Sequence, residues 1–285
     1  MNDIPTTLYK YMPFRKEFFD NFYLRCTPRS ALNDPFELRP SKEYRLDDIA
    51  GFPNVERIEE LSPRQLERLQ ELVEVRFKKM GIISLSEERN NIIMWSHYAN
   101  DHKGIAVELD TNNAFFSCNG GMFDLKEFRH VSYEHEEKRS KKVPWRFYEN
   151  ELPDQDHNKI FFEKSKCWDQ ECEYRIINDL AVADEILCPI DHYIDNLQSK
   201  HPSYTPKIIS EKIVSLKYYP NVFLELWHPS ILCMFKLPDD CILSVTCGAL
   251  MSDDDKKYIK EKAKELNFIY DEAKLCDKEY KLNFL

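Results

Sequence analysis

Glycine is scarce in this chain: six glycines occur in 285 residues. Such a composition argues against glycine-rich phosphate loops, and the sequence contains neither G-x-G-x-x-G nor G-x-x-x-x-G-K-[ST]. The pair Gly120-Gly121 is isolated and predicts a turn. We therefore expect no nucleotide binding through either of these two motifs.

Long apolar runs and metal-binding cysteine spacings are also missing. No apolar run approaches the roughly 18 to 20 residues that cross a bilayer, and the N-terminal stretch MNDIPTTLYKYM lacks the pattern of an export signal. Without such a signal, the nine cysteines predict reduced thiols in a cytoplasmic protein. They include no C-x-x-C pair, which argues against a zinc module. We accordingly expect no membrane contact and no metal.

Positive charge is in deficit. The formal net charge of -10 disfavours binding dominated by nucleic-acid phosphates. The local exception is the segment 138–146, KRSKKVPWR, with five basic residues and a tryptophan. One interpretation is a solvated loop that follows the acidic EHEE. The other is a basic contact that steers an RNA or nucleotide toward a nearby cleft.

The remaining composition is that of a folded protein. A hydrophobic fraction of 42% with 13% aromatic residues is enough for a core. Helical and strand patterns alternate irregularly, which predicts an α+β fold in a single domain over 1–285. Segments 41–80 and 185–235 are expected to be helical or loop insertions in that domain.

Several elements can be assigned from local patterns. Ser62 followed by Pro63 and Gln65 forms a capping box and predicts a helix that begins there. In the strand predicted over 81–88, Ile83 and Leu85 oppose Ser84 and Ser86. Further predictions are strands at 7–11 and 105–110, a helix capped by Ser252, and a final strand pair.

The stretch KCWDQECEYRII, residues 166–177, has a polar face. If it is extended from Gln170 onward, Glu171, Glu173 and Arg175 share one side. Paired carboxylates can oppose a developing positive charge or move a proton, and Arg175 can hold a phosphate or neutralise Glu173. An exposed strand face bearing an ion pair remains the alternative.

The stretch MWSHYANDHKG concentrates aromatic and polar side chains. Trp95, His97 and Tyr98 suit a pocket that stacks a planar ring. Equally, Trp95 and Tyr98 can be core anchors with His97 satisfied internally. His97 and His102 are five residues apart, which does not match a helical zinc pair.

Two N-terminal stretches add candidates. In a strand, Tyr9 and Tyr11 share a face and Lys10 opposes them. The turn LNDPFE gathers Asn33, Asp34 and Glu37, although turn chemistry explains much of this pattern.

In order, these stretches resemble an uncharacterised bacterial family, domain-of-unknown-function family 2971. The matching signatures are LYKY, LNDPFE, SLSEE…MWSHYANDHKGIAVELD, FFEKSKCWDQECEYRI and ILSVTCGALMSDDDKKYI. They extend over almost the whole chain, and the family brings no assigned activity.

A more distant resemblance is to ADP-ribosyltransferases, which present an aromatic-basic first strand, a serine-containing middle strand and a later Glu-x-Glu. LYKY, ISLS and ECE occur here in that order. The resemblance implies a split antiparallel or mixed sheet, Glu173 as catalytic glutamate and Glu171 as the residue that positions the acceptor. It also implies a nucleotide site formed by Tyr9, Lys10, Tyr11, Ser84, Ser86, Trp95, His97, Tyr98 and Arg175.

We therefore expect an NAD-dependent ADP-ribosyltransferase-like protein, with NAD as substrate and a protein or RNA as acceptor. By analogy with related-looking transferases, its role would be that of a toxin or antiphage effector with an antitoxin or defence-system partner. One alternative is a non-catalytic nucleotide-sensing module of a defence system. Another is a metal-dependent nuclease that uses Asp34, Glu37, Asp101 and Glu171.

Overall fold

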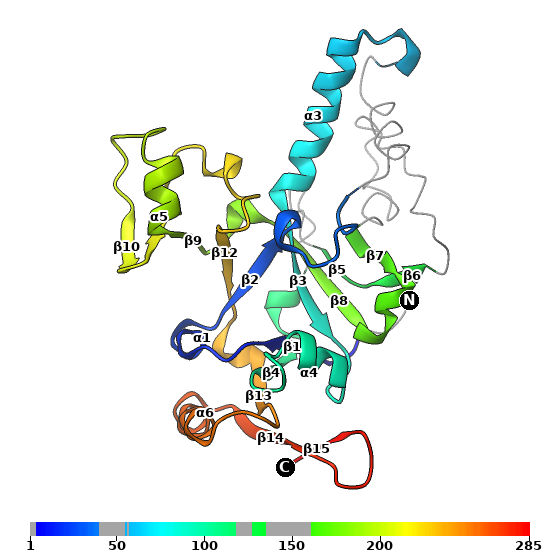
Figure 1. The fold of residues 1–285 in the computed structure, drawn as a ribbon, viewed down its shortest axis with the longest axis vertical. Helices are drawn as coiled ribbons and strands as arrows, with labels where there is room; N and C mark the ends of the chain where they lie inside the picture. Colours follow the sequence, from blue (N-terminus) through cyan, green and yellow to red (C-terminus); the bar gives the residue numbers. More distant parts are fainter. Residues whose placement is uncertain (1–3, 40–54, 56, 118–126, 135–160) are drawn as a thin grey trace.

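A computed structural model describes residues 4–39, 55, 57–117, 127–134 and 161–285. The basic segment 138–146 lies outside the described residues. Figure 1 shows helices set around one large mixed sheet, and the predicted α+β class is confirmed. Among the described helices, none is long and apolar enough to cross a membrane.

The large sheet follows the order β10-β11-β9-β12-β2-β3-β1-β4-β13-β14-β15, with β8 on β3 and β5 on β8. Among the strands of the described residues, β13 and β14 form the one parallel pairing in this sheet, and β6 and β7 form a separate parallel pair. The strands are β1 (Thr7–Met12), β2 (Tyr23–Pro28), β3 (Met80–Ser86), β4 (Ile105–Asp110), β5 (Glu127–His130), β6 (Ser132–Glu134), β7 (Glu163–Ser165), β8 (Glu173–Asp179), β9 (Glu185–Pro189), β10 (Lys207–Ser210), β11 (Ile213–Ser215), β12 (Leu232–Lys236), β13 (Ile242–Cys247), β14 (Ile269–Leu275) and β15 (Leu282–Phe284).

The helical elements are mostly short. The α-helices are α1 (Lys16–Asn21), α3 (Pro63–Lys79), α4 (Ile92–His97), α5 (Ile190–His192) and α6 (Asp253–Leu266). The other helical turns are η1 (Arg29–Ala31), η2 (Ile58–Glu60), η3 (Ala114–Phe116), η5 (Lys166–Glu171), η6 (Leu180–Val182), η7 (Tyr193–Leu197), η8 (Val222–Leu224) and η9 (Asp239–Cys241).

The sheet is split along one edge of β3. Strand β2 pairs with the beginning of β3, at Gly81 and Ile82, whereas β1 pairs with its end at Ser86. Between these pairings, the Ser84 carbonyl accepts a hydrogen bond of 2.8 Å from Lys10 Nζ. The opposite edge of β3 pairs with β8 along its whole length. The split therefore lies beside the strand pair that carries the predicted serines and Glu173.

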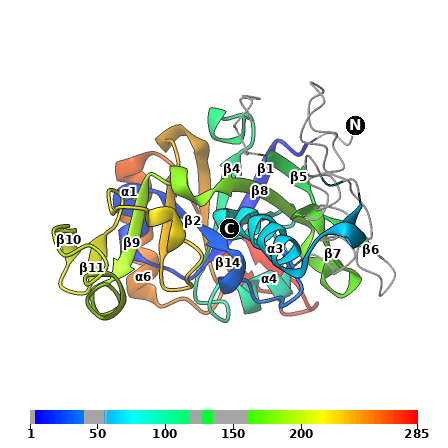
Figure 2. The ribbon, with the colours of Figure 1, turned by 90° about the horizontal axis from the view of Figure 1, so that it is seen from above.

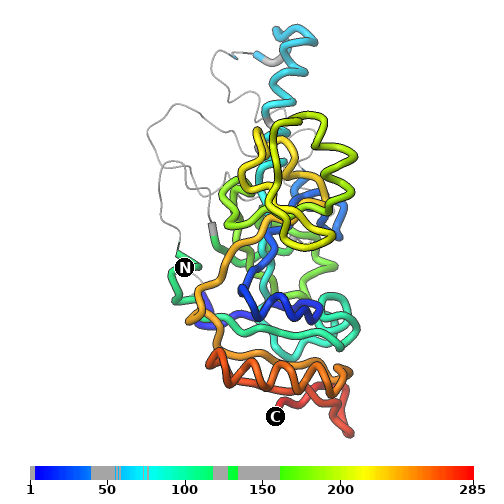
Figure 3. Tube along the Cα trace, turned by 90° about the vertical axis from the view of Figure 1, so that its left-hand side faces the viewer, coloured from blue at the N-terminus to red at the C-terminus, as the bar shows by residue number. Residues whose placement is uncertain are grey.

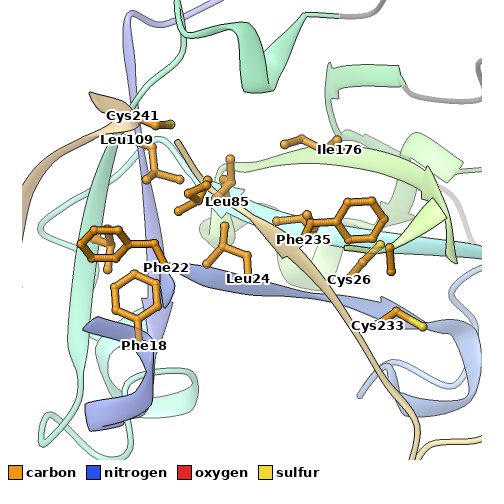
Figure 4. Close-up of a cluster of buried hydrophobic side chains, with 14 of the residues drawn as sticks. Phe18, Phe22, Leu24, Cys26, Leu85, Leu109, Ile176, Cys233, Phe235 and Cys241 are labelled. Atoms are coloured by element: carbon orange, nitrogen blue, oxygen red, sulfur yellow. The ribbon is translucent and has the colours of Figure 1, made fainter. Parts of the chain in front are cut away.

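Each central strand has an apolar face and a polar face. Ile83 and Leu85 of β3 join the main core with Leu8 of β1 and Leu109 of β4. Figure 4 shows Leu85 and Leu109 in this core, together with aromatic side chains from α1 and β12. Ser84 and Ser86 occupy the other face of β3, as the alternation predicts. The apolar face anchors the sheet, which leaves the opposite face for polar side chains.

Helix α3 begins as predicted: the Ser62 side chain accepts from Gln65 N, and the Gln65 side chain accepts from Ser62 N. Its buried end packs Phe77 into a smaller core with Leu66 and Leu69. The rest of α3 projects from the sheet in Figure 1, and Figure 2 looks almost along it, with β8 beside it.

The segment 185–235 differs from the expected helical or loop insertion. It contributes β9, β10, β11 and most of β12 to the large sheet, in addition to short helical turns. Figures 1 and 3 show these elements, yellow-green to gold, gathered at one side of the molecule. The predicted strands at 105–110 and at the C-terminal end, and the helix capped by Ser252, are confirmed.

Candidate functional site

Four of the singled-out stretches meet on the polar face of the sheet beside the split. Ser86 of β3 lies opposite Glu173 of β8 on one side and Tyr9 of β1 on the other. After α4, the Tyr98 hydroxyl donates a hydrogen bond of 2.5 Å to Glu171 Oε1. Stretches that are far apart in the sequence, namely LYKY, SLS, MWSHY and ECE, therefore contribute to one site.

At the centre of the site, Arg175 and Glu173 form a bidentate ion pair. Arg175 Nε lies 2.9 Å from Glu173 Oε1, and Arg175 Nη2 lies 2.9 Å from Glu173 Oε2. Arg175 Nη2 also donates to Glu37 Oε1. Arg175 is 1% exposed, which favours the ion-pair alternative over that of a phosphate ligand.

Lys164 joins three carboxylates. Its Nζ lies 2.5 Å from Glu171 Oε2, 3.2 Å from Glu173 Oε2 and 3.2 Å from Glu37 Oε1. The Trp168 ring covers this ammonium, with its centroid at 4.9 Å. We call Glu37, Lys164, Glu171, Glu173 and Arg175 the charge cluster. All five side chains are buried, and the cluster holds one more carboxylate than it holds cations.

The pKa values in the charge cluster follow from burial and from the charges that face one another. Burial opposes ionisation of Glu173, but Arg175 and Lys164 outweigh it and lower the pKa of Glu173 to about 2. Burial also opposes protonation of Lys164, yet the three carboxylates hold its pKa above the usual range. For Glu37 burial prevails over Arg175 and Lys164 and raises the pKa. Glu173 therefore stays charged, and Glu37 takes up a proton more readily than an ordinary glutamate.

Glu171 does not lie on the strand that the sequence predicted. The turn η5 ends at Glu171, and Cys172 adopts the left-handed region with φ 44° before β8 begins. Ser86 Oγ fixes this turn by donating a hydrogen bond of 2.7 Å to the Glu171 carbonyl oxygen. The prediction of an extended segment from Gln170 onward is therefore wrong, although Glu171 still reaches the same cluster as Glu173.

The two predicted serines differ in what they contact. The Ser84 side chain is partly exposed and hydrogen-bonds Glu173, which helps to lower the pKa of that carboxyl. Ser86 is fully buried and is used by the Glu171 carbonyl and by Glu88 N. Of the two alternatives, Ser84 is therefore favoured for ligand contact, because the Ser86 hydroxyl is buried and connects the Glu171 and Glu88 backbones.

The aromatic candidates also separate by burial. Trp95 is fully buried, donates from Nε1 to the Arg89 carbonyl at 3.1 Å, and packs edge-on against Tyr11 at 5.2 Å. Tyr11 is buried too, and its hydroxyl reaches the carbonyls of Glu88 and Arg89. Their burial favours the core-anchor alternative for Trp95 and a structural role for Tyr11. His97 is exposed at the end of α4, and Tyr98 is partly exposed beside it.

Lys10 projects from the core face of β1, and Tyr9 and Tyr11 project from its other face, as predicted. On the neighbouring strand β4, Lys10 pairs with the core residue Val107 and Tyr9 pairs with Glu108. Its stem starts on the core side and its ammonium enters the split to reach the Ser84 carbonyl. Burial there lowers the pKa of Lys10 to about 8, against the attraction of Glu173. Lys10 therefore places a partly neutral amine close to the charge cluster.

Two members of the site were missed or undervalued at the level of sequence. Lys164 lies within the signature FFEKSKCWDQECEYRI, but no chemical motif singled it out, because its role depends on three carboxylates that only the folded chain brings within 3.2 Å of its ammonium. Glu37 was noted within LNDPFE only as a turn residue or a metal ligand. The same turn supplies Asn33, which donates a hydrogen bond of 2.9 Å to the Tyr98 hydroxyl.

The four carboxylates of the nuclease interpretation do not form one metal site. The Lys164 ammonium stands between Glu37 and Glu171, Asp34 accepts from Phe36 N within its own turn, and Asp101 is exposed in a left-handed turn. Within the part of the chain that the structure describes, no group of three or more His, Cys, Asp or Glu side chains is arranged to hold a metal ion.

Comparison with known proteins finds one family model that matches part of the chain. Residues 94–176, from α4 to β8, match the family model described as a protein of unknown function, DUF2971. The resemblance to this family that the sequence predicts is confirmed over that segment, which includes Tyr98, Lys164, Glu171, Glu173 and Arg175. No curated protein and no solved structure matches the chain.

Proposed function

We propose that this protein is an ADP-ribosyltransferase-like enzyme that binds NAD on the polar face beside the split and transfers its ADP-ribose to a protein or RNA. The observation that carries the proposal is the excess of negative charge in the charge cluster next to Ser84 and the split. Loss of nicotinamide from the ribose passes through an oxocarbenium-like state. A buried, preorganised anionic site stabilises a positive charge that develops beside it.

The residues take separate parts in this proposal. Glu173, held ionised by Arg175 and Lys164, opposes the developing charge at the ribose. Ser84 supports Glu173 and faces the ribose, while Tyr98 and the exposed His97 line the nicotinamide side. Glu171, bonded to Tyr98, orients the acceptor. As the cysteine pattern predicts, the proposed location is the cytoplasm, and the proposed role is a toxin or antiphage effector with an antitoxin or defence-system partner.

A non-catalytic nucleotide-binding module is the second candidate. A carboxylate accepts about four hydrogen bonds, and Glu173 already receives two from Arg175, one from Lys164 and one from Ser84. This saturation favours a carboxylate that shapes a binding site over one that exchanges partners during catalysis.

One experiment separates these functions: NAD binding, NAD consumption and transfer of labelled ADP-ribose are measured for the wild type, Ser84→Ala and Glu173→Gln. The control is Glu87→Gln, which removes a charge from an exposed side chain next to β3. For the transferase we expect consumption to fall roughly 100-fold in Glu173→Gln, about tenfold in Ser84→Ala, which keeps the ion pairs intact, and not at all in the control.

The outcomes are distinct. Consumption that is equal in all four proteins would disprove the role of Glu173. Binding without consumption by the wild type would favour the nucleotide-binding module, and absence of NAD binding would eliminate both functions. Because Glu173→Gln weakens a buried ion pair, its folding is verified by thermal unfolding. If Glu173→Gln does not fold, the comparison of Ser84→Ala with the wild type is the test.

A further inference from the structure

The split has a second wall, which strand β2 forms. Strand β2 pairs with β3 at its end, where Thr27 is opposed by Ile82, and Figure 1 shows the two strands diverging from there. Continued in the same register, this ladder would bring Arg25 opposite Ser84. The neighbours of Arg25 along β2 belong to the main core, so Arg25 projects from the polar face. Arg25 and Ser84 therefore lie on opposite sides of the split, on the same face of the sheet.

Arg25 carries a positive charge that no carboxylate balances among the described residues. Its Nη2 donates a hydrogen bond of 3.1 Å to the Pro229 carbonyl, and its Nε is buried and has no hydrogen-bond partner in the described part of the chain. Burial lowers the pKa of Arg25, and the groups that act on its charge are two cysteine thiols and Arg15. Glu185 lies two strands away on this face and accepts from a serine of β11. Arg25 thus contrasts with Arg175, whose guanidinium is held by two carboxylates.

Two further cations lie beside Arg25. Lys10 extends into the split to the Ser84 carbonyl, and the charge of Arg25 contributes to the lowering of its pKa. Arg15, the exposed residue that precedes α1, acts on Arg25 in the same way. Like charges disfavour one another, and a partly buried charge is stabilised by a counter-ion. Because Arg25, Lys10 and Ser84 are all partly exposed, this wall of the split is in contact with solvent, unlike the buried charge cluster.

We propose that Arg25, Arg15 and Lys10 form an anion site on the β2 side of the split, and that this site takes a diphosphate group. A planar guanidinium with an unused N–H, next to an ammonium, suits phosphoryl oxygens. A diphosphate carries several negative charges, which three cations can balance. The site does not require the proposed binding of NAD. If NAD binds, its diphosphate and its cationic ring would face opposite charges on the two sides of the split.

The test measures the affinity of the full chain for inorganic pyrophosphate, and separately for NAD, by calorimetry. The variants are Arg25→Gln and Arg15→Gln, and the control is Lys274→Gln, which removes one exposed positive charge from β14 of the same sheet. We expect the affinity for pyrophosphate to fall about tenfold or more in Arg25→Gln. It should fall about threefold in Arg15→Gln, whose exposed charge is screened, and stay unchanged in the control.

Thermal unfolding separates a binding residue from a merely structural one. Without ligand, Arg25→Gln should unfold at the same Tm as the wild type or at a higher one, because it removes a partly buried charge that lacks a carboxylate. Pyrophosphate should raise the Tm of the wild type but not that of Arg25→Gln. Should Arg25→Gln not fold, Arg25→Lys is used instead, because it keeps the charge but loses the planar fork.

The outcomes separate this inference from the proposed function. Pyrophosphate binding that is absent in the wild type, or equal in the wild type and Arg25→Gln, would overturn the inference; with the replacement variant, the overturning result is equal binding in Arg25→Lys, Arg15→Gln and the wild type. If pyrophosphate binds through Arg25 but NAD does not bind, the inference stands and the proposed function fails. If NAD binds and pyrophosphate does not, the inference fails and the proposed function stands.

Discussion

At the scale of single residues, Lys164 makes more ion pairs than any other side chain of the charge cluster. Its ammonium faces three carboxylates at once, and it is buried together with them. Charges that are buried in this way are tolerated only while they are paired, because each unpaired ion has lost its hydration. Lys164 therefore determines whether the carboxylates of the site can remain ionised in the folded protein.

Replacement of Lys164 by methionine should consequently destabilise the fold. We expect Lys164→Met to lower the free energy of unfolding at pH 7 by about 3 to 5 kcal/mol. The loss should be smaller at pH 5, where the carboxylates left unpaired can take up protons. Urea denaturation measures both values. Lys166→Met is the control: this exposed lysine is 3.9 Å from Asp169, so less than about 1 kcal/mol is expected. Equal losses in the two variants would contradict the role of Lys164.

Lys10 offers a chemical test of the split. A pKa of about 8 leaves much of this amine neutral at pH 8, whereas an ordinary lysine is neutral at well under 1%. We expect Lys10 to be among the first lysines acylated by limiting acetic anhydride at pH 8, as read by peptide mass spectrometry. At pH 6 the amine is protonated, so this preference should disappear. An unreactive Lys10 at pH 8 would show that its ammonium is not accessible from the polar face.

At the scale of elements, local patterns predicted those elements whose energetics are local. The alternation in 81–88 identified the core face of β3, and the serine and glutamine at 62 and 65 identified the start of α3. The turn η5 was not predictable in this way. Its last residue, Glu171, is held by Ser86 and Lys164, and these contacts come from other parts of the fold. Strand β10 was missed for a related reason, since it is exposed at all four residues and has no alternating apolar face.

The two serine-capped helices should respond differently to loss of their caps. Ser62 and Ser252 each accept a backbone hydrogen bond from the residue three positions on. Substitution of either by alanine removes about 1 kcal/mol of helix stability. Much of α3 projects from the sheet (Figure 1), so Ser62→Ala should accelerate amide exchange in its first turns with little change in Tm. Helix α6 buries Ile259 and Ala263 in the main core, so Ser252→Ala should lower Tm.

Hydrogen exchange and thermal unfolding of both alanine variants measure this difference. Equal decreases in Tm would mean that α3 is as tightly coupled to global unfolding as α6 is.

At the scale of the whole molecule, the charge cluster connects ligand charge to protonation. The cluster holds one carboxylate more than it holds cations. Burial raises the pKa of Glu37, and the neighbouring Glu173 adds to the rise. A cationic group bound nearby would offset the excess negative charge. It would lower the pKa of Glu37 and release the proton. Cation binding and proton release are therefore linked through one side chain.

This linkage predicts that the protein distinguishes NAD from NADH, whose nicotinamide ring carries no charge. The oxidised form should bind about tenfold more tightly, as expected for one unit charge several Å from the cluster at a moderate effective dielectric constant. Its affinity should rise as the pH rises through the raised pKa of Glu37, because protonated Glu37 does not contribute the negative charge that attracts the ring. Glu173, with a pKa of about 2, and Lys164, whose pKa is raised, keep their charges at neutral pH.

Glu37→Gln isolates the linkage. This variant keeps a hydrogen-bonding side chain toward Arg175 and Lys164 but removes the excess charge, so we expect it to fold and to lose the pH dependence of NAD binding. NADH binding should be nearly independent of pH in both proteins. Calorimetry in two buffers with different ionisation enthalpies measures the proton released with each nucleotide. The same affinity for NAD and NADH at every pH would mean that neither ligand places its nicotinamide beside the charge cluster.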